Sequence, residues 1–447
     1  MKLNYKRTFF VGLAFLSICA FWELYDNVVP KMLEKSFNMG ETAAGVVMAM
    51  DNVLALLLLP LFGAFSDKVN TRLGKRTPFI LIGTIVASVF ILLLPVAEQQ
   101  GSLVLFLISL GMVLIAMGSY RSPAVALMPD LTPKPLRSKA NAVINLMGTL
   151  GGAYALLVIR TLYTEKEGTS KLPVFLAVVG LMILAVVLLL ITIREKKLTK
   201  ELRLQEQKER LYTEDENQSD IKMNHTEDIG AHTEEINETE DHKMPVEVRR
   251  SFAFIMASIF LWFFAYNAVK TAFSRYAEKV WGFSEGGFAD PLLIALGAAL
   301  ISYIPIGIIS SKIGRKKTII AGIILMTMSY FLGFMVLEYS ITINLIFAFT
   351  GIGWAAINVN SYPMVVEMSK SSNVGRYTGL YYTFSMSAQI ITPILSGFLL
   401  ENISYRTLFP YAVTFSLASL CTMLFVKHGD SKPLKKVNVI ENYDTPD

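Results

Sequence analysis

Carboxyl and aromatic side chains interrupt the first two long apolar stretches of the sequence. Glu23 and Asp26 are three residues apart, and Trp22 lies one helical turn before Asp26. Asp51 lies near the middle of the next apolar stretch. Surroundings of low dielectric favour the neutral form of a carboxyl group, so such a group can load a proton on one side of a barrier and release it on the other. These three carboxyl groups are the candidate proton carriers, and Asp51 ranks first by its central position.

Other polar and aromatic side chains recur within the apolar stretches. A polyhydroxylated ligand needs hydrogen-bond donors and acceptors, and an aromatic face for the C–H side of its ring. The predicted binding residues are Trp22, Glu23, Asp26, Tyr266, Asn267, Lys270, Trp354, Asn358, Asn360 and Gln389. Structural roles stay open for the same residues: the lysine can extend to the membrane surface, the tryptophans can pack, and the amides can link neighbouring helices.

Composition limits the class of protein. The 447 residues are 53% hydrophobic and only 17% charged, which predicts a chain whose solvent is a lipid bilayer. The net charge of +5 does not indicate a nucleic-acid partner, because the basic residues fall in short loops and form no basic face with interleaved aromatics. No nucleophile–base set, metal-ligand spacing or cofactor motif is found, so neither an enzyme nor a cofactor is expected.

Apolar runs of membrane-spanning length are predicted at 8–29, 42–65, 77–96, 102–128, 138–161, 172–193, 250–279, 287–311, 317–337, 341–366, 375–400 and 406–427. Lysine and arginine concentrate in alternate loops, which places both termini in the cytoplasm of a multi-pass protein of the cell membrane. The first run is read as a retained span because no small-residue cleavage site follows it. Arg275, Glu401 and Arg406 fall near the outer surface and are expected to be solvated.

A charged segment divides the spans into two sets of six. Residues 194–249 begin with a basic stretch and turn acidic, a composition that predicts a largely disordered cytoplasmic linker. The predicted domains are therefore a six-helix bundle at 1–193, this linker, a second bundle at 250–427 and a cytoplasmic tail at 428–447. The sequence contains four histidines, at His225, His232, His242 and His428, and none lies in a predicted span.

The two halves repeat one another at an offset of about 240 residues. "GAFSDKVNTRLGKR" at 63–76 matches "GIISSKIGRKK" at 307–317, and the segment beginning "PAVALMPD" at 123 matches the one beginning "PMVVEMSK" at 363. More weakly, "FWELYDNV" matches "WFFAYNAV" and aligns Asp26 with Asn267. Parallel repeats of six helices predict a transporter with its binding site between the halves, near the middle of the bilayer.

The loop at 63–76 is predicted to be part of a cytoplasmic gate. A glycine at the end of the second span permits close helix approach, an aspartate can pair with arginine, and the basic residues hold the loop at the anionic leaflet. The candidate gate residues are Gly63, Asp67, Arg72, Arg76, Arg121, Asp130, Arg137, Arg315 and Arg376. A purely structural ion-pair role stays open for Arg121 and Asp130. Phosphate binding is disfavoured because no strand–loop–helix context surrounds the glycines.

The pattern of "GAFSDKVNTRLGKR" resembles the signature of the major facilitator superfamily, and "SDKVNTRLGKRTPFI" resembles the sucrose–proton symporters and the glycoside–pentoside–hexuronide group. The segment "SPAVALMPDLTPKPLRSKANA" is similar to the helix 4–5 region of that group, which gives Asp130, Arg137 and Asn141 a place in its pattern. Val125 and Leu59 depart from that pattern, at positions where plant members tend to have arginine and glutamine.

The resemblance implies an all-α membrane protein with twelve transmembrane helices in two pseudo-symmetric bundles. It implies a monomeric secondary active transporter that imports a sugar or glycoside with a cation, H⁺ or Na⁺, by alternating access. Two alternatives stay open: proton-driven export of amphipathic compounds, and a membrane sensor that binds a ligand without moving it.

Overall fold

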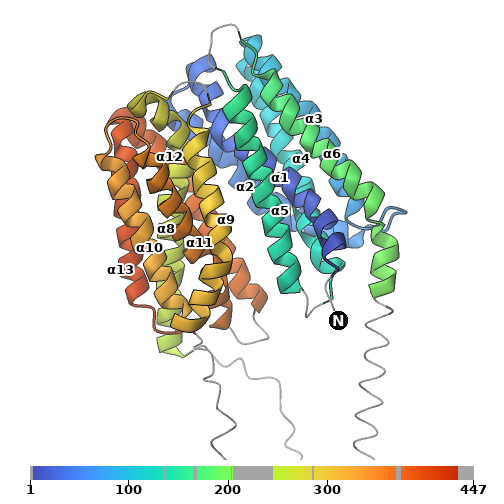
Figure 1. Cartoon of the computed structure of the whole chain (residues 1–447). Helices are drawn as coiled ribbons and strands as arrows, with labels where there is room; N and C mark the ends of the chain where they lie inside the picture. Colours follow the sequence, from blue (N-terminus) through green and yellow to red (C-terminus); the bar gives the residue numbers. More distant parts are fainter. Residues whose placement is uncertain are drawn as a thin grey trace, which may run out of the picture. The chain divides into compact units, whose positions relative to one another are not determined.

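The computed structural model describes residues 4–133, 137–164, 169–202, 204, 245–283, 286–368 and 374–430 (Figure 1). The described elements are all helical. They are α1 (Tyr5–Phe37), α2 (Glu41–Lys68), α3 (Thr77–Gln99), α4 (Leu103–Asp130), α5 (Arg137–Leu162), α6 (Leu172–Thr192), α8 (Val246–Trp281), α9 (Ala289–Ile313), α10 (Arg315–Met335), α11 (Thr342–Glu367), α12 (Val374–Asn402), the 3-10 turn η3 (Tyr405–Thr407) and α13 (Leu408–Leu424).

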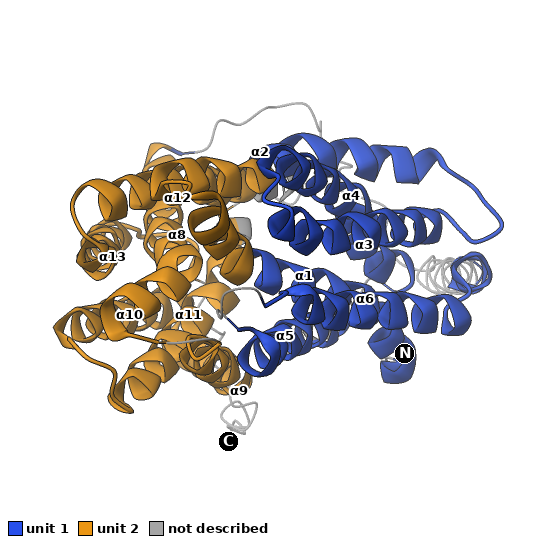
Figure 2. Ribbon diagram, turned by 90° about the horizontal axis from the view of Figure 1, so that it is seen from above, with its two compact units in different colours: residues 1–25, 53–245 blue, residues 26–52, 246–447 orange. Residues whose placement is uncertain are grey.

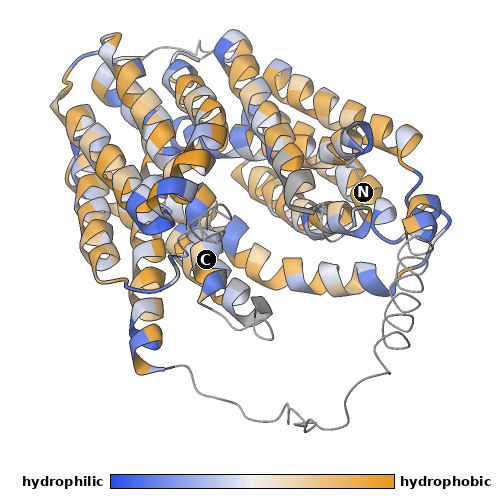
Figure 3. Ribbon diagram, turned by 60° about the horizontal axis from the view of Figure 1, so that its bottom comes forward, coloured by the Kyte–Doolittle hydropathy of each residue, from blue (hydrophilic) through white to orange (hydrophobic). Residues whose placement is uncertain are grey.

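Twelve helices in the described part of the chain are long and apolar enough to cross a membrane. Many large apolar side chains point outward; Ile301 is 76% exposed and Ile191 70% exposed, as expected for contact with lipid rather than water. Hydrophobic residues run along the helices, and hydrophilic residues gather towards the helix ends (Figure 3). The predicted all-α membrane fold is confirmed.

The first helix is longer than the sequence predicted. The apolar run was expected to end at residue 29, but α1 continues through Pro30 to Phe37. Residues 31–35 contain two lysines and a glutamate, which the hydropathy pattern excludes from a span. These charges form ion pairs with α8, described below, so that the added helical turns are stabilised by tertiary contacts.

The chain forms two compact units, coloured separately in Figure 2. One contains residues 1–25 and 53–245, and the other contains residues 26–52 and 246–447. The second half of α1 and the first half of α2 therefore group with the C-terminal helices rather than with the predicted bundle at 1–193. Most of the predicted linker and the tail after residue 430 lie outside the described residues, so the disorder of the linker and the cytoplasmic location of the tail stay predictions.

Small residues allow close helix packing within each unit. In the first unit a Cβ on Gly83 of α3 would lie 2.6 Å from the Tyr120 side chain of α4. In the second unit a Cβ on Gly351 of α11 would lie 2.0 Å from the backbone oxygen of Ala295 in α9. Close approach at small residues is the packing that membrane helices favour, because lipid gives them no hydrophobic drive to associate.

Candidate functional site

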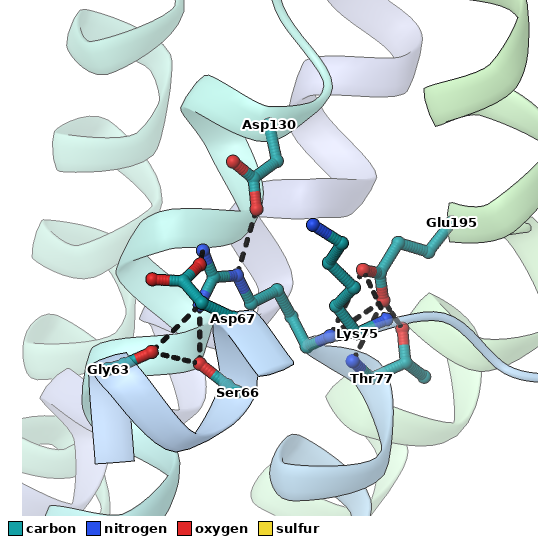
Figure 4. A network of polar contacts seen from close by, with 8 residues as sticks. Gly63, Ser66, Asp67, Lys75, Thr77, Asp130 and Glu195 are labelled. Atoms are coloured by element: carbon teal, nitrogen blue, oxygen red, sulfur yellow. Dashed lines mark hydrogen bonds and ion pairs between the residues drawn. The ribbon is translucent and has the colours of Figure 1, made fainter. Parts of the chain in front are cut away.

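The guanidinium of Arg76, in the loop between α2 and α3, is the centre of a polar network (Figure 4). Its Nε donates to Asp130 Oδ2 at 2.8 Å, and its Nη2 donates to Asp67 Oδ1 at 2.6 Å. Its Nη1 donates to the Gly63 carbonyl at 3.3 Å and to the Ser66 hydroxyl. The side chain is only 7% exposed. The structure thus brings together four predicted gate residues, on α2, on α4 and in the loop between α2 and α3.

Glu195, which the sequence reasoning missed, holds the other side of the same loop. Its carboxylate accepts from the backbone amides of Lys75, Arg76 and Thr77, at 2.8 to 3.1 Å, and from the Thr77 hydroxyl at 2.7 Å. These amides begin α3, where backbone N–H groups lack helical partners and the helix dipole favours an anion. Gly74 permits this approach with φ of +124°. The sequence feature that could have indicated Glu195 is a carboxylate directly after the sixth predicted span.

The second unit repeats this arrangement at the start of α10. Gly314 has φ of +98°, and Asp430 Oδ1 accepts from the backbone amides of Arg315 at 2.6 Å and Lys316 at 3.3 Å. The Arg315 guanidinium forms an ion pair with Glu367 of α11. In each unit, therefore, a carboxylate that follows the sixth helix caps the third helix, and an arginine at the start of the third helix pairs with a carboxylate of the fourth. The repeat seen in the sequence extends to residues that the alignment did not include.

The remaining gate candidates lie elsewhere. Arg72 is exposed, and no ion pair is recorded for it among the described residues. The side chains of Arg137 and Arg376 are outside the described residues. Arg121 lies with its guanidinium carbon 5.6 Å from the ring centre of Trp22.

Arg121 and Trp22 form a cation–aromatic pair in the first unit. In the described part of the chain no carboxylate lies within ion-pair distance of Arg121, and the buried Trp22 Nε1 has no hydrogen-bond acceptor. Ionisable groups at membrane depth are rare and most often functional. A cation and an N–H donor are therefore present at membrane depth for a ligand rich in oxygen atoms.

A row of ion pairs fixes residues 26–52 to α8 in the second unit. We call this row the charged seam. It consists of Asp26, Lys31, Glu34 and Lys35 of α1, Glu41 of α2, and Lys270, Arg275, Glu278 and Lys279 of α8. The N–O distances are 2.7 Å for Asp26–Lys270, 2.9 Å for Lys31–Glu278, 3.0 Å for Glu34–Lys279 and 3.0 Å for Glu41–Arg275, and Lys35 also pairs with Glu278.

Several members of the charged seam are buried. The side chain of Lys31 is 1% exposed, that of Glu41 4% and that of Arg275 6%. The expectation that Arg275 would be solvated is therefore wrong, because this arginine is buried and paired with Glu41 of α2, a tertiary contact that hydropathy cannot indicate. Glu401 and Arg406 are exposed, as expected. Breaking a buried pair leaves an uncompensated charge, so the seam resists separation of its two sides.

Hydrogen bonds and close backbone contacts extend the seam to α12 and η3. Glu401 of α12 accepts from the backbone amide of Thr42 at 2.8 Å and from its hydroxyl. Tyr405 of η3 contacts Glu41. A Cβ on Gly45 of α2 would lie 2.2 Å from the backbone oxygen of Pro393 in α12, so the two helices touch at this glycine.

One face of α8 combines aromatic and polar predicted binding residues. The predicted residues Tyr266, Asn267 and Lys270 follow at helical spacing, together with Phe263, which was not predicted. The Tyr266 ring stacks on that of Trp354 of α11, with centroids 3.8 Å apart and planes 4° apart, and Phe263 meets Trp354 edge-on at 5.4 Å. The buried Asn267 Nδ2 has no hydrogen-bond acceptor in the described chain. This face offers an aromatic surface next to an unused donor and the Asp26–Lys270 pair.

The other predicted binding and coupling residues have mainly local contacts. Asn360 Nδ2 donates to the carbonyl of Ala356, and Gln389 Nε2 donates to that of Ser385, each within its own helix. The Asn358 side chain hydrogen-bonds Tyr303 of α9.

Asp51 and Glu23, two of the three candidate proton carriers, are both half-buried. Asp51 accepts from Asn52 Nδ2 at 2.7 Å. Glu23 lies on α1. In the described residues no cluster of His, Cys, Asp and Glu could hold a metal ion.

Comparison with known families decides the class of this fold. Residues 11–303 and 292–441 match the Major Facilitator Superfamily. The chain belongs to this superfamily. The xylose transporter XylE from E. coli, in an inward-open conformation, shares the fold at a TM-score of 0.63, with 16% identity and 96% of each chain covered.

Individual relatives are distant. An uncharacterised transporter of the superfamily from Methanocaldococcus jannaschii is 25% identical over 418 residues, 90% of each chain. Sucrose transport protein SUC3 of Arabidopsis thaliana is 28% identical over 118 residues, which cover 22% of this chain and only 20% of the plant protein. The family match establishes the superfamily, and the substrate is left to the residues of the site.

Proposed function

We propose that this superfamily member imports a sugar or glycoside together with a proton, by alternating access, across a cell membrane with both of its termini in the cytoplasm. The proposal rests chiefly on one observation, the Tyr266–Trp354 stack beside Asn267 and Lys270. Aromatic faces bind the C–H side of a sugar ring, and the amide and ammonium groups bind its hydroxyls. The similarity to a plant sucrose transport protein supports the same substrate class.

In the proposed cycle the two ion-pair networks hold opposite sides of the membrane barrier. The Arg76 network lies at the ends of α2 and α4, beside the predicted cytoplasmic loops. The charged seam lies at the opposite end of α2, near the first predicted outer loop. Each network breaks when its side opens, so that the central site faces one solution at a time.

The proton supplies the driving force. Each charge that moves down the membrane potential contributes about 2.3 kcal/mol per 100 mV, which is sufficient to concentrate a neutral sugar. Asp51, Asp26 and Glu23 remain the proposed carriers. Asp26 is distinctive among them because its ion pair with Lys270 lies next to the aromatic face, where a bound substrate can compete for either partner.

Uptake by the purified full chain in proteoliposomes tests this function. A panel of labelled mono- and disaccharides is offered under an imposed inward proton gradient. We expect gradient-dependent uptake of at least one sugar, a large loss in Trp354→Ala, and partial retention in Trp354→Phe, which keeps an aromatic face. Phe331→Ala, at a side chain that is 49% exposed on α10, is the matched control and retains uptake.

Two results contradict the proposal. Uptake of no sugar by a folded preparation, with gradient-driven efflux of cationic dyes, supports the exporter instead. Saturable sugar binding without counterflow supports a sensor that does not transport.

A further inference from the structure

The hydroxyl of Tyr405 is shared by two carboxyl groups of the charged seam. Its oxygen lies 2.5 Å from Glu41 Oε1 and 3.3 Å from Glu34 Oε1. A phenol carries one hydrogen and donates it along one direction, so two ionised carboxylates cannot both be satisfied by it. The second contact becomes a hydrogen bond only if the other carboxyl group carries a proton and donates to the phenol oxygen.

The second oxygens of the two carboxyl groups have fewer partners. Glu34 Oε2 is buried and has no hydrogen-bond donor within the described residues, and Glu41 Oε2 faces Arg275 Nε at 3.0 Å in an ion pair that is not aligned as a hydrogen bond. The two carboxyl groups are neighbours, because the Tyr405 hydroxyl contacts an oxygen of each. Two neighbouring carboxylates repel, whereas a carboxylic acid and a carboxylate attract through the shared proton.

The charged groups that face this pair come from several elements. α8 contributes Arg275, whose Nε is 3.0 Å from Glu41 Oε2, and Lys279, whose Nζ is 3.0 Å from Glu34 Oε1. Farther along the seam are Asp26, Lys31, Lys35, Lys270 and Glu278, and the exposed Glu401 and Arg406 lie on α12 and η3. Lys279 is 45% exposed, so its attraction to Glu34 is weakened by water, and Glu41 is held mainly by the buried Arg275.

We propose that Glu34 and Glu41, bridged by Tyr405, bind one proton when the charged seam is closed. The proton adds to a carboxylate oxygen of the pair and is shared with the other carboxylate and the phenol oxygen. When α8 and η3 separate from residues 26–52, the pair loses Arg275 and Tyr405, and the proton is released. Closure of the seam is therefore favoured by acid on the side that it faces, which in the proposed orientation is the outside.

This inference deepens the proposed function, since it rests on alternating access, but its test requires no sugar. Cys19 and Cys421 are first replaced by serine in the full chain. A reporter cysteine is placed at Ala44, which is fully buried on α2. The rate of modification by a membrane-impermeant thiol reagent, added outside proteoliposomes, then measures how often the seam opens. A second reporter at Ile403, which is 67% exposed, corrects for the pH dependence of the thiol reaction itself.

If closure binds one proton, a higher external pH disfavours the closed seam. The corrected rate of thiol modification in Ala44→Cys therefore rises with external pH, by at most about tenfold per pH unit. In Glu41→Gln and in Glu34→Gln the amide supplies the missing donor at every pH, so the pH dependence disappears. Tyr405→Phe keeps the two carboxyl groups, and its pH dependence survives with a shifted midpoint. Glu278→Gln is the matched control, since that carboxylate pairs with two lysines; it opens the seam at all pH values and retains the slope.

Three results overturn the inference: a corrected rate independent of pH in the parent protein, a falling rate, or an unchanged slope in both glutamine variants. Loss of the slope in these variants, in a protein that transports no sugar, leaves the proton site standing and removes the proposed substrate. Sugar uptake by a protein whose seam does not respond to pH supports the proposed substrate and removes the proton site.

Discussion

The Nζ atom of Lys270 lies 2.7 Å from Asp26 Oδ2. This ion pair joins α1 to α8 at positions that are almost equivalent in the two sequence repeats. Asp26 aligns with Asn267, one turn before Lys270, so the pair links the two repeats at the level of the proposed binding site. Asp26 is 13% exposed and Lys270 is 32% exposed. Such a pair is stable enough to persist and accessible enough for a ligand to compete with it.

The first prediction concerns this pair. Asp26→Asn leaves Lys270 without its carboxylate, and we expect the free energy of unfolding to fall by about 1–2 kcal/mol and sugar affinity to fall more than tenfold. The exchanged double variant, Asp26→Lys with Lys270→Asp, restores the ion pair and recovers part of the stability. Thermal unfolding in detergent and uptake kinetics measure the two effects. Equal stability of the single and double variants would contradict a direct interaction.

The second prediction concerns Glu195. Its buried carboxylate serves several N–H groups at the start of α3, so Glu195→Ala should lower the free energy of unfolding by about 2–3 kcal/mol. Glu195→Gln keeps one acceptor and should lose less. Glu201→Ala is the matched control, because this glutamate is 52% exposed and, among the described residues, its ion pair is with Lys197 of the next turn. Equal unfolding midpoints for Glu195→Ala and Glu201→Ala would contradict the role of Glu195 in capping α3.

The third prediction concerns the contact between α2 and α12. In Gly45→Ala the new methyl group meets the backbone oxygen of Pro393, which cannot move aside as a side chain can. We expect the charged seam to close less often and transport to fall several-fold, with little change in expression. Gly111→Ala adds a methyl group where no atom lies within 4 Å, and should transport like the parent. Normal uptake by Gly45→Ala would mean that α2 and α12 need not touch.

The fourth prediction separates Arg121 from the cytoplasmic gate. Because its recorded contact is with Trp22 and not with Asp67 or Asp130, Arg121→Gln should weaken substrate binding without loosening the Arg76 network. Arg121→Lys keeps the charge and should bind better than Arg121→Gln. Binding to the purified protein and proteolysis of the loop between α2 and α3 report the two effects. Faster cleavage of that loop in Arg121→Gln would contradict this prediction and support a role of Arg121 in the proposed gate.

The sequence predicted the membrane-spanning helices well, for physical reasons that act locally. A helix in lipid must be apolar over about 20 residues, so hydropathy alone locates it. Motif spacing and the repeat selected Arg76, Asp67 and Asp130 as gate candidates, but the structure was needed to show that Arg76 pairs with both aspartates. Glu195 escaped notice because its role depends on where α3 begins in space relative to the end of α6.

The charged seam could not be predicted from the sequence. Lys31, Glu34 and Glu278 stand at the ends of apolar runs, where charged residues are normally solvated. Their burial depends on which helices are neighbours, and hydropathy does not carry that information. The same holds for Arg275: its partner Glu41 lies on another helix, and the pair is covered only after α2 packs against α8.

Alkalinisation of the medium on addition of a sugar tests the central claim most directly. In lightly buffered suspensions of cells or proteoliposomes that contain the protein, the imported sugar and proton should make the external pH rise, in proportion to sugar uptake. Asp51→Asn should abolish the pH rise while sugar exchange continues, and Glu338→Gln, at an exposed loop position, should behave like the parent. Sugar uptake with no pH change, or an undiminished rise in Asp51→Asn, would contradict proton symport or the role of Asp51.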